Sequence, residues 1–190
     1  MDRPPNADLV ARAQAGEQDA WDAIVAAYEG LVWSVVRSFR LSDAEAHDIT
    51  QTTWLRLVEN LGSIREPNAI GGWLATTARR ECIAAYKRSG RSIPTDPATL
   101  DEPDETVEAP GAGVFQQERA KVVWEALHQL GDKCFQLLRI LLADPPPTYI
   151  DVSAALEMPI GSIGPTRQRC LENLRALLER RGITGEFAAS

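Results

Sequence analysis

One segment, residues 92–113, most limits how this chain can fold. Its 22 residues include four prolines, two glycines and six acidic side chains, and no basic one. Such a composition buries too little apolar surface to offset the entropy lost on ordering. We therefore expect a linker here, able to reach on the order of 60–70 Å if largely extended. It would join two small domains, residues 1–91 and residues 114–190.

The linker also accounts for nearly all of the net charge of −7. Residues 1–91 carry 11 basic and 12 acidic side chains, and residues 114–190 carry nine of each. Both domains can therefore present basic faces to nucleic acid, although the chain as a whole is acidic.

The first domain has apolar residues at three- and four-residue steps, which is typical of amphipathic helices. Ser42 and Glu45 have the spacing of a capping box at a helix start. No stretch alternates with a period of two, so we expect an all-α fold. The helices expected here are a short one around Asp8 to Ala15, a second from Trp21 to Phe39, a third from Ser42 to Leu61, and a fourth from Ile70 to near Gly90.

Three tryptophans of this domain, Trp21, Trp54 and Trp73, fall on the apolar stripes, and we expect them in the core. Val58 falls on the same pattern in the third helix. Gly30 interrupts the second helix as a mild defect.

The second domain also has the pattern of four helices. They are expected near Gln116 to Leu130, Asp132 to Leu142, Tyr149 to Glu157, and from Ser162 to about Arg181, with Thr148 and Ser162 as caps. A short helix, a glycine-containing turn and a longer basic helix form a helix-turn-helix pattern, although many helical hairpins look similar.

The three cysteines, Cys82, Cys134 and Cys170, are far apart in helical apolar patterns, so we expect buried thiols that act as small hydrophobes. With only two histidines besides, no metal-ligand spacing appears, and we expect no metal and no cofactor. No catalytic motif is present, which disfavours an enzyme.

Residues 79–91 include five basic side chains and a single acidic one, Glu81. Repeated positive charge at helical spacing suits phosphate contacts. It also suits a solvated helix end whose cations complement the helix dipole, and the residues alone do not separate these interpretations. In the last helix, the first turns would enter the major groove if it is a recognition helix.

Three stretches, taken in order, resemble the sigma-70 family, and specifically its small extracytoplasmic-function (ECF) branch. The stretch Asp48-Ile-Thr-Gln-Thr-Thr-Trp-Leu55 is similar to the family's Asp-Leu-x-Gln-Glu-x-Phe-Leu segment, which docks on the polymerase clamp helices. Trp73-Leu74 followed by Ala78-Arg79-Arg80 resembles the helix that opens and holds the minus-ten promoter element. The stretch from Tyr149 to Ile163 resembles the minus-thirty-five reader.

The resemblance implies a non-catalytic subunit that lends promoter specificity to RNA polymerase, with region 2 at 1–91 and region 4 at 114–190. It implies core-polymerase contacts at Asp48, Gln51, Thr52 and Leu55. It implies minus-ten contacts at Asn68, Arg79, Arg80, Lys87, Arg88 and Arg91. It implies minus-thirty-five contacts at Ser162, Gly164, Pro165, Thr166, Arg167, Gln168 and Arg169. The implied partners are core RNA polymerase, promoter DNA and a cognate anti-sigma factor.

The chain departs from the family pattern at several of these positions. Thr52 replaces the usual acid after Gln51, and Arg80 stands where asparagine is common. Arg167 falls between Ile163 and Cys170, where a buried face is expected. The acidic linker has two open interpretations, an imitation of RNA in a basic channel or a plain solubilising tether.

A second function class is a stand-alone helix-turn-helix regulator whose N-terminal bundle binds a ligand or partner. An anti-sigma-like adaptor without a DNA role is disfavoured by the basic residues after position 79. The N-terminus lacks the apolar core of a signal peptide, and no stretch stays uncharged long enough to span a bilayer. We therefore expect a cytoplasmic protein.

Overall fold

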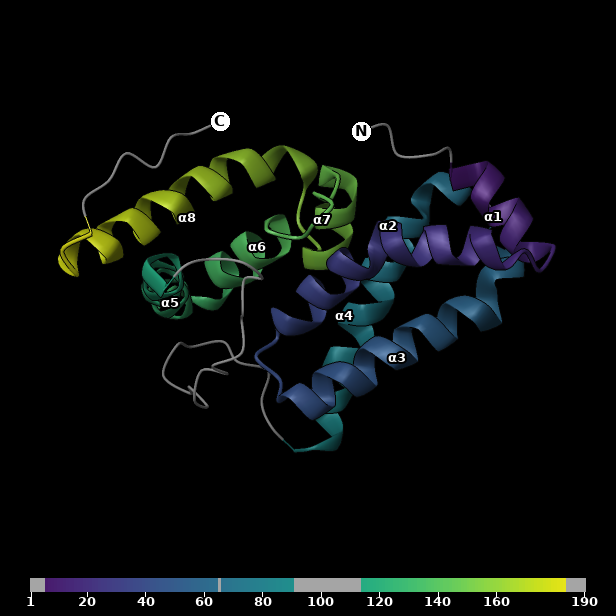
Figure 1. Cartoon of the computed structure of the whole chain (residues 1–190), viewed down its shortest axis with the longest axis horizontal. Coiled ribbons are helices and arrows are strands. Elements are labelled where there is room, and N and C mark those ends of the chain that lie inside the picture. The colour runs from purple at the N-terminus through teal and green to yellow at the C-terminus, as the bar shows by residue number, and fades with distance from the viewer. Residues whose placement is uncertain (1–5, 65, 91–113, 184–190) are drawn as a thin grey trace.

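Helices make up every secondary-structure element in the residues that this computed structural model describes, which are 6–64, 66–90 and 114–183 (Figure 1). The all-α prediction is confirmed for these residues, and the predicted linker lies outside them. The first half contains α1 (Asn6–Gln14), α2 (Gln18–Arg37), α3 (Asp43–Asn60), the 3-10 turns η1 (Leu61–Ser63) and η2 (Pro67–Ala69), and α4 (Ile70–Arg88). The second half contains α5 (Val114–His128), α6 (Asp132–Leu141), α7 (Tyr149–Leu156) and α8 (Ile160–Arg180). No helix among the described residues has the length and apolar character needed to cross a membrane.

Helix α2 is the centre of the first half, because the predicted stripe from Trp21 to Phe39 turns toward α1, α3 and α4. Its side chains Ile24, Val32 and Val35 are almost fully buried. Each such burial stabilises the fold by about 1.5–3 kcal/mol relative to an exposed side chain. Trp21, like Trp54 and Trp73, is half-buried and packs against this core, so the three tryptophans lie at the edge of the predicted core and not inside it.

Two of the three predicted caps are present. The Ser42 hydroxyl accepts from the Glu45 amide, and the Glu45 carboxylate accepts from the Ser42 amide at 3.1 Å. Thr148 and Asp151 form the equivalent pair at the start of α7. The cap predicted at Ser162 is wrong, because α8 begins at Ile160, two residues earlier. The Ser162 hydroxyl instead donates to the carbonyl of Pro159 at 2.7 Å.

The cysteine prediction holds for one of the three residues. Cys82 is a buried free thiol, and burial raises its pKa to about 12. Cys134 and Cys170 are joined in a disulfide with 5.2 Å between their Cα atoms, which corrects the expectation of three separate thiols. The pair is 36 residues apart in sequence and meets only because α6 packs against α8.

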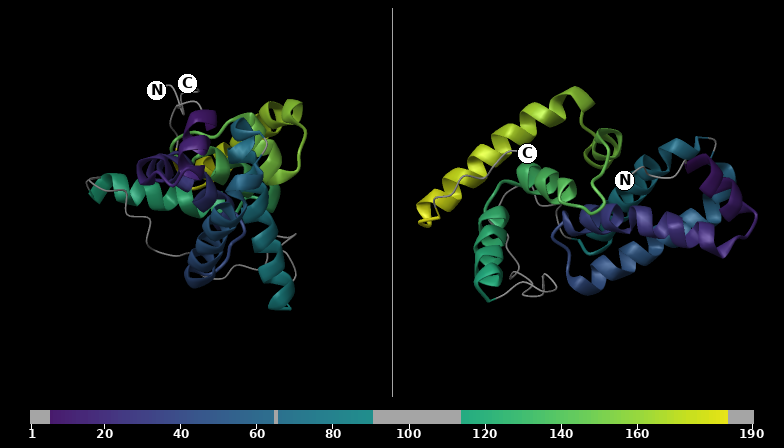
Figure 2. Two further views of the ribbon diagram at one scale, coloured as in Figure 1. Left: turned by 90° about the vertical axis from the view of Figure 1, so that its right-hand side faces the viewer. Right: turned by 45° about the horizontal axis from the view of Figure 1, so that its top comes forward.

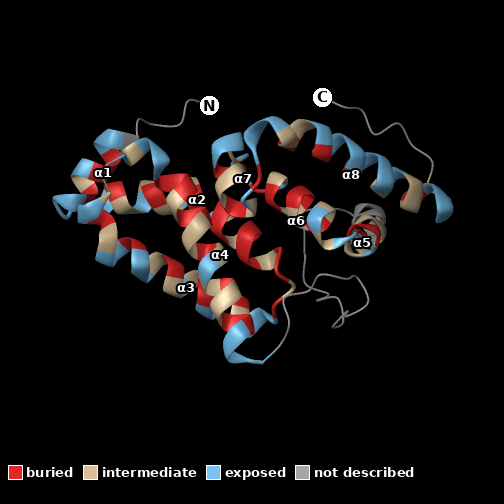
Figure 3. Ribbon diagram, turned by 180° about the vertical axis from the view of Figure 1, so that it is seen from behind, coloured by how far each residue is buried: buried red, intermediate tan, exposed pale blue. Residues whose placement is uncertain are grey.

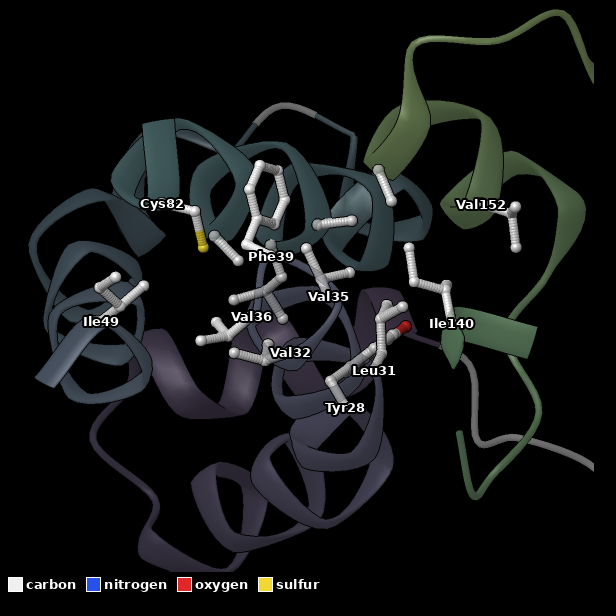
Figure 4. Packing of buried hydrophobic residues seen from close by; sticks show 14 of the residues in the cluster. Tyr28, Leu31, Val32, Val35, Val36, Phe39, Ile49, Cys82, Ile140 and Val152 are labelled. Carbon is white, nitrogen blue, oxygen red and sulfur yellow. The ribbon is translucent and has the colours of Figure 1, made fainter. Parts of the chain in front are cut away.

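The two halves share one continuous core. Helix α7 lies along α4, and α6 lies against α2 (Figure 2, right). Figure 4 shows Ile140 of α6 beside Leu31 of α2, and both side chains are almost fully buried. The same cluster extends to Val152 of α7. The described residues of both halves therefore form a closed arrangement in which each half covers part of the other.

Two glycines allow this close approach. A Cβ atom on Gly30 of α2 would lie 2.1 Å from the backbone oxygen of Asp144, which belongs to the second half. A Cβ atom on Gly71 of α4 would lie 2.4 Å from Oδ1 of Asp151 in α7 and 2.8 Å from Cε1 of Tyr28. Gly30 is therefore more than a helix defect, because the contact between the halves leaves no room for a side chain there.

Candidate polymerase and nucleic-acid interfaces

The predicted docking residues lie on one open face of α3. Asp48, Gln51 and Leu55 are all exposed, as expected from their three- and four-residue spacing (Figure 3). The Thr52 hydroxyl donates to the carbonyl of Asp48 at 2.8 Å, so the local helix already satisfies it.

Val58 extends this face by one further turn, and the sequence prediction missed it. The exposed fraction is 57% for Leu55 and 58% for Val58, so the two side chains together add apolar surface to this face of α3. Gln51, Leu55 and Val58 follow one another at four- and three-residue steps, so the spacing puts them on one face but does not show that this face is exposed. Its position on the apolar stripe had instead suggested a core residue.

The basic residues of α4 divide into two groups. Arg80, Lys87 and Arg88 are exposed, as is Asn68 in η2, whereas Arg91 lies outside the described residues. Arg79 is only 22% exposed along its side chain and points to the second half of the chain. We define Arg80, Lys87 and Arg88 as the basic face of α4.

Arg79 is held by an ion pair that joins the two halves. Its Nη2 donates to the carboxylate of Glu157 at 2.8 Å, while its buried Nε has no hydrogen-bond partner within the described part of the chain. The Glu157 side chain is well exposed, so the pair contributes only about 0–1 kcal/mol. In this arrangement Arg79 is engaged with the second half rather than open to DNA.

Arg40 forms the more buried polar link between the halves. Its Nη2 donates to the carbonyls of His128 at 3.1 Å and Leu130 at 3.2 Å. The guanidinium also lies 3.5 Å from the carboxylate of Asp132 and 4.5 Å from the ring centroid of Phe135. Its side chain is only 11% exposed. Arg40 lies in the turn after α2, so one side chain ties this turn to the corner between α5 and α6.

Both links use an unusual backbone conformation. Among the described residues, Arg40 (φ 52°) and Glu157 (φ 50°) are the two non-glycine residues with positive φ. Glu157 occupies the cap position after α7, where glycine is common. A non-glycine residue with this positive φ lowers the stability of the fold by about 1–3 kcal/mol, and it persists where neighbouring contacts hold it in place. Here the surroundings are contacts with the other half.

The first turns of α8 place most of the predicted minus-thirty-five residues at the surface. Pro165, Arg167, Gln168 and Arg169 are exposed, and Ser162 and Gly164 are half-buried. Figure 3 shows the outer side of α8 as a largely exposed strip. This side of α8 is therefore exposed and accessible to a partner.

Two positions of α8 differ from the sequence expectation. Arg167 points outward, whereas it was expected near the buried face. The buried face is instead made by Ile163, Thr166 and Cys170, at three- and four-residue steps. Thr166 is only 6% exposed, and its hydroxyl accepts from Arg169 at 3.4 Å. Thr166 therefore supports α8 and steadies Arg169 in this arrangement.

Residues 24–92 match the family model described as Sigma-70 region 2, which includes α3 and α4 and the faces described above. These residues are therefore identified as a sigma-70 region 2. The chain is 24% identical to the RNA polymerase sigma-H factor of Pseudomonas aeruginosa over 163 residues, which cover 82% of this chain and 84% of that protein. It is 27% identical to the ECF RNA polymerase sigma factor BldN of Streptomyces coelicolor over 124 residues, which cover 65% of this chain but only 47% of that protein.

Two solved structures share the fold of this chain. CnrH, in complex with the cytosolic domain of CnrY, matches with a TM-score of 0.61 at 18% identity and covers 94% of this chain and 99% of that chain. The sigma factor RpoE of Bartonella quintana, in complex with the anti-sigma factor NepR, matches with a TM-score of 0.59 at 21% identity and covers 78% of this chain and 89% of that chain. The predicted ECF-type fold is confirmed.

Proposed function

We propose that this sigma factor binds core RNA polymerase through α3 and directs it to promoters through the basic face of α4 and the first turns of α8. Its role in transcription initiation follows from its family, whose members are non-catalytic subunits of the polymerase. The observation that carries the proposal is the open face of α3 within the region 2 match, where Gln51, Leu55 and Val58 are exposed together.

The α3 face supports a protein partner more than a nucleic-acid partner. Leu55 and Val58 expose apolar surface to water. Covering this surface with a protein partner is favourable because it removes apolar area from water. Gln51 supplies hydrogen bonds, and Asp48 supplies the remaining charge at the start of this face. Because Thr52 carries no charge, apolar contact accounts for more of the binding than the usual acidic pattern would imply.

The DNA-facing surfaces support two kinds of contact. Lys87 and Arg88 are exposed near the end of α4, where they suit sequence-independent phosphate contacts. Gln168 and Arg169 are exposed in the third turn of α8, where their side chains can reach base edges if α8 is a recognition helix. Gly164 and Pro165 carry no hydrogen-bonding side chain, so DNA shape contributes to upstream recognition.

The domain assignment completes this proposal, with residues 1–91 as region 2, 92–113 as a linker and 114–190 as region 4. In the closed arrangement Arg79 is paired with Glu157, so its proposed minus-ten contact requires the halves to separate. A cognate anti-sigma factor that favours the closed arrangement would oppose this step. RpoE was solved in complex with the anti-sigma factor NepR, and CnrH in complex with the cytosolic domain of CnrY.

Run-off transcription with purified core polymerase tests the function directly. Adding this chain should produce transcripts from its promoters, while core polymerase alone should produce none. The stand-alone regulator would instead bind duplex promoter DNA tightly without polymerase. Tight binding of the free chain with no polymerase-dependent transcript would overturn the proposal in favour of that regulator.

A further inference from the structure

The disulfide between α6 and α8 is a feature that promoter recognition does not require. Cys134 lies in the first turn of α6 and is half-buried. Cys170 lies in the middle of α8, directly after Arg169, and has no exposed surface. Cys134 is thus the more exposed residue of the pair, and its sulfur is bonded to that of the fully buried Cys170.

The third cysteine does not compete for this bond. Cys82 is fully buried in the first half, in the cluster around α2 and α4 (Figure 4). Burial raises the pKa of its thiol to about 12, so it stays protonated and unreactive at neutral pH. Oxidation of the folded chain therefore has one intramolecular product, which joins Cys134 to Cys170.

We propose that Cys134 and Cys170 are a reversible oxidation site, closed by a hydroperoxide and opened by a dithiol. The Cys134 thiolate attacks one oxygen of hydrogen peroxide, the O–O bond breaks, and a sulfenic acid forms as hydroxide leaves and takes up a proton as water. The Cys170 sulfur then attacks the Cys134 sulfur, and the hydroxyl group leaves as a second water. Two thiols lose two electrons, and one peroxide is reduced to two waters. A dithiol reverses the bond by thiol–disulfide exchange and is itself oxidised to a disulfide.

The bond connects two functional parts of the second half. Cys170 belongs to the buried face of α8, next to Thr166, and directly follows Arg169 on the proposed DNA-facing side. Cys134 directly precedes Phe135, whose ring lies under the Arg40 guanidinium. Oxidation therefore joins α8, the proposed recognition helix, covalently to α6, close to the α5–α6 corner that Arg40 contacts. In the reduced chain, α8 and α6 are in contact without a covalent bond between them.

Thiol counting on the full chain tests this site. The folded protein is treated with hydrogen peroxide or with dithiothreitol, the reagent is removed, and the denatured chain is alkylated and weighed. We expect one alkylated cysteine after peroxide and three after dithiothreitol, through repeated cycles. The melting temperature of the oxidised chain should be higher by on the order of 5–15 °C, because a cross-link over 36 residues restricts the unfolded chain.

Two variants and a clear set of contrary outcomes complete the test. Cys82→Ala should keep the peroxide-dependent loss of two thiols, while Cys134→Ser should abolish it. Three free thiols after peroxide, or dimers joined through cysteine, would overturn the proposal. So would a bond that dithiothreitol opens only after the chain is denatured, because that result describes a permanent cross-link. The readout needs neither polymerase nor DNA, so its failure is independent of the proposed function.

Discussion

Replacing Gly30 with alanine should push the two halves of this sigma factor apart. The added Cβ would lie 2.1 Å from the backbone oxygen of Asp144 and 3.0 Å from its carbonyl carbon. An ordinary van der Waals contact begins near 3.4 Å, so the shortfall is about 1.3 Å. Because the obstructing atom belongs to the backbone, no side-chain rotation relieves the overlap. Helix α2 and the loop before α7 must move relative to each other.

The size of the effect follows from two opposing terms. Overpacking of this kind costs about 1–3 kcal/mol. That free energy shifts the balance between closed and open arrangements by roughly 5- to 150-fold toward the open one. Within α2 alone the change is favourable, since alanine is a better helix former than glycine by about 1 kcal/mol. The substitution should therefore open the contact between the halves without unfolding the first half.

Small-angle scattering and circular dichroism together measure this outcome. The radius of gyration of Gly30→Ala should increase while its helix content is retained. Gly62→Ala is the matched control, because nothing lies within 4 Å of the Cβ position there and its φ is not positive. If Gly30→Ala keeps the radius of gyration of the unchanged protein, the halves do not meet at Asp144 and the reasoning is refuted.

Three further results are expected. Replacing Gln51 and Leu55 together with alanine should weaken binding to core polymerase in a pull-down without loss of helicity; unchanged binding would exclude this docking face. When holoenzyme binding is measured across a salt series, Lys87→Ala should flatten the salt dependence by roughly 0.7–0.9 of a log unit at every promoter. Arg169→Ala should instead weaken the binding free energy by about 1–3 kcal/mol, and only where the upstream element is intact. Equal losses on intact and scrambled elements would make Arg169 a phosphate contact. Burial, followed by the charges of neighbouring arginines, lowers the pKa of His128 below its ordinary 6.5. The unfolded chain therefore binds the proton more readily, and the free energy of unfolding should fall as the pH drops below about 6.5. In denaturant titrations His128→Gln should flatten this pH dependence, and an unaltered slope would assign the dependence to other groups.

Several features could be predicted from the sequence because their causes are local. A capping box needs only a hydroxyl and a carboxylate three residues apart, so Ser42 and Thr148 were identifiable from the sequence. A buried stripe needs only the three- and four-residue rhythm, so the core positions of α2 were predictable as well. The Ser162 cap prediction failed for a local reason too, since Pro159 takes the cap position, where its missing amide hydrogen costs nothing, and α8 begins at Ile160.

The candidate site was predictable in part. Helical spacing placed Gln51 and Leu55 on one face, and the structure exposes both. The same spacing could not show that Val58 is exposed and that Thr166 is buried, because a stripe indicates two faces and not which neighbour covers each. Exposure of a helix face depends on the helices packed against it, and these come from distant parts of the chain.

The sequence by itself determined that this chain forms amphipathic helices in two groups, and its motifs placed it among sigma factors. Only the tertiary structure decided what the groups do to each other. In the sequence Gly30 is only a weak point in a helix, whereas in the structure it leaves room for the backbone of Asp144. The sequence likewise does not show that the Arg40 guanidinium donates to carbonyls at the α5–α6 corner. Cys134 and Cys170 were separate thiols until α6 and α8 packed together. The physical reason is the same in each case: helix formation depends on neighbours three or four residues away, whereas these contacts depend on which helix surfaces exclude water together.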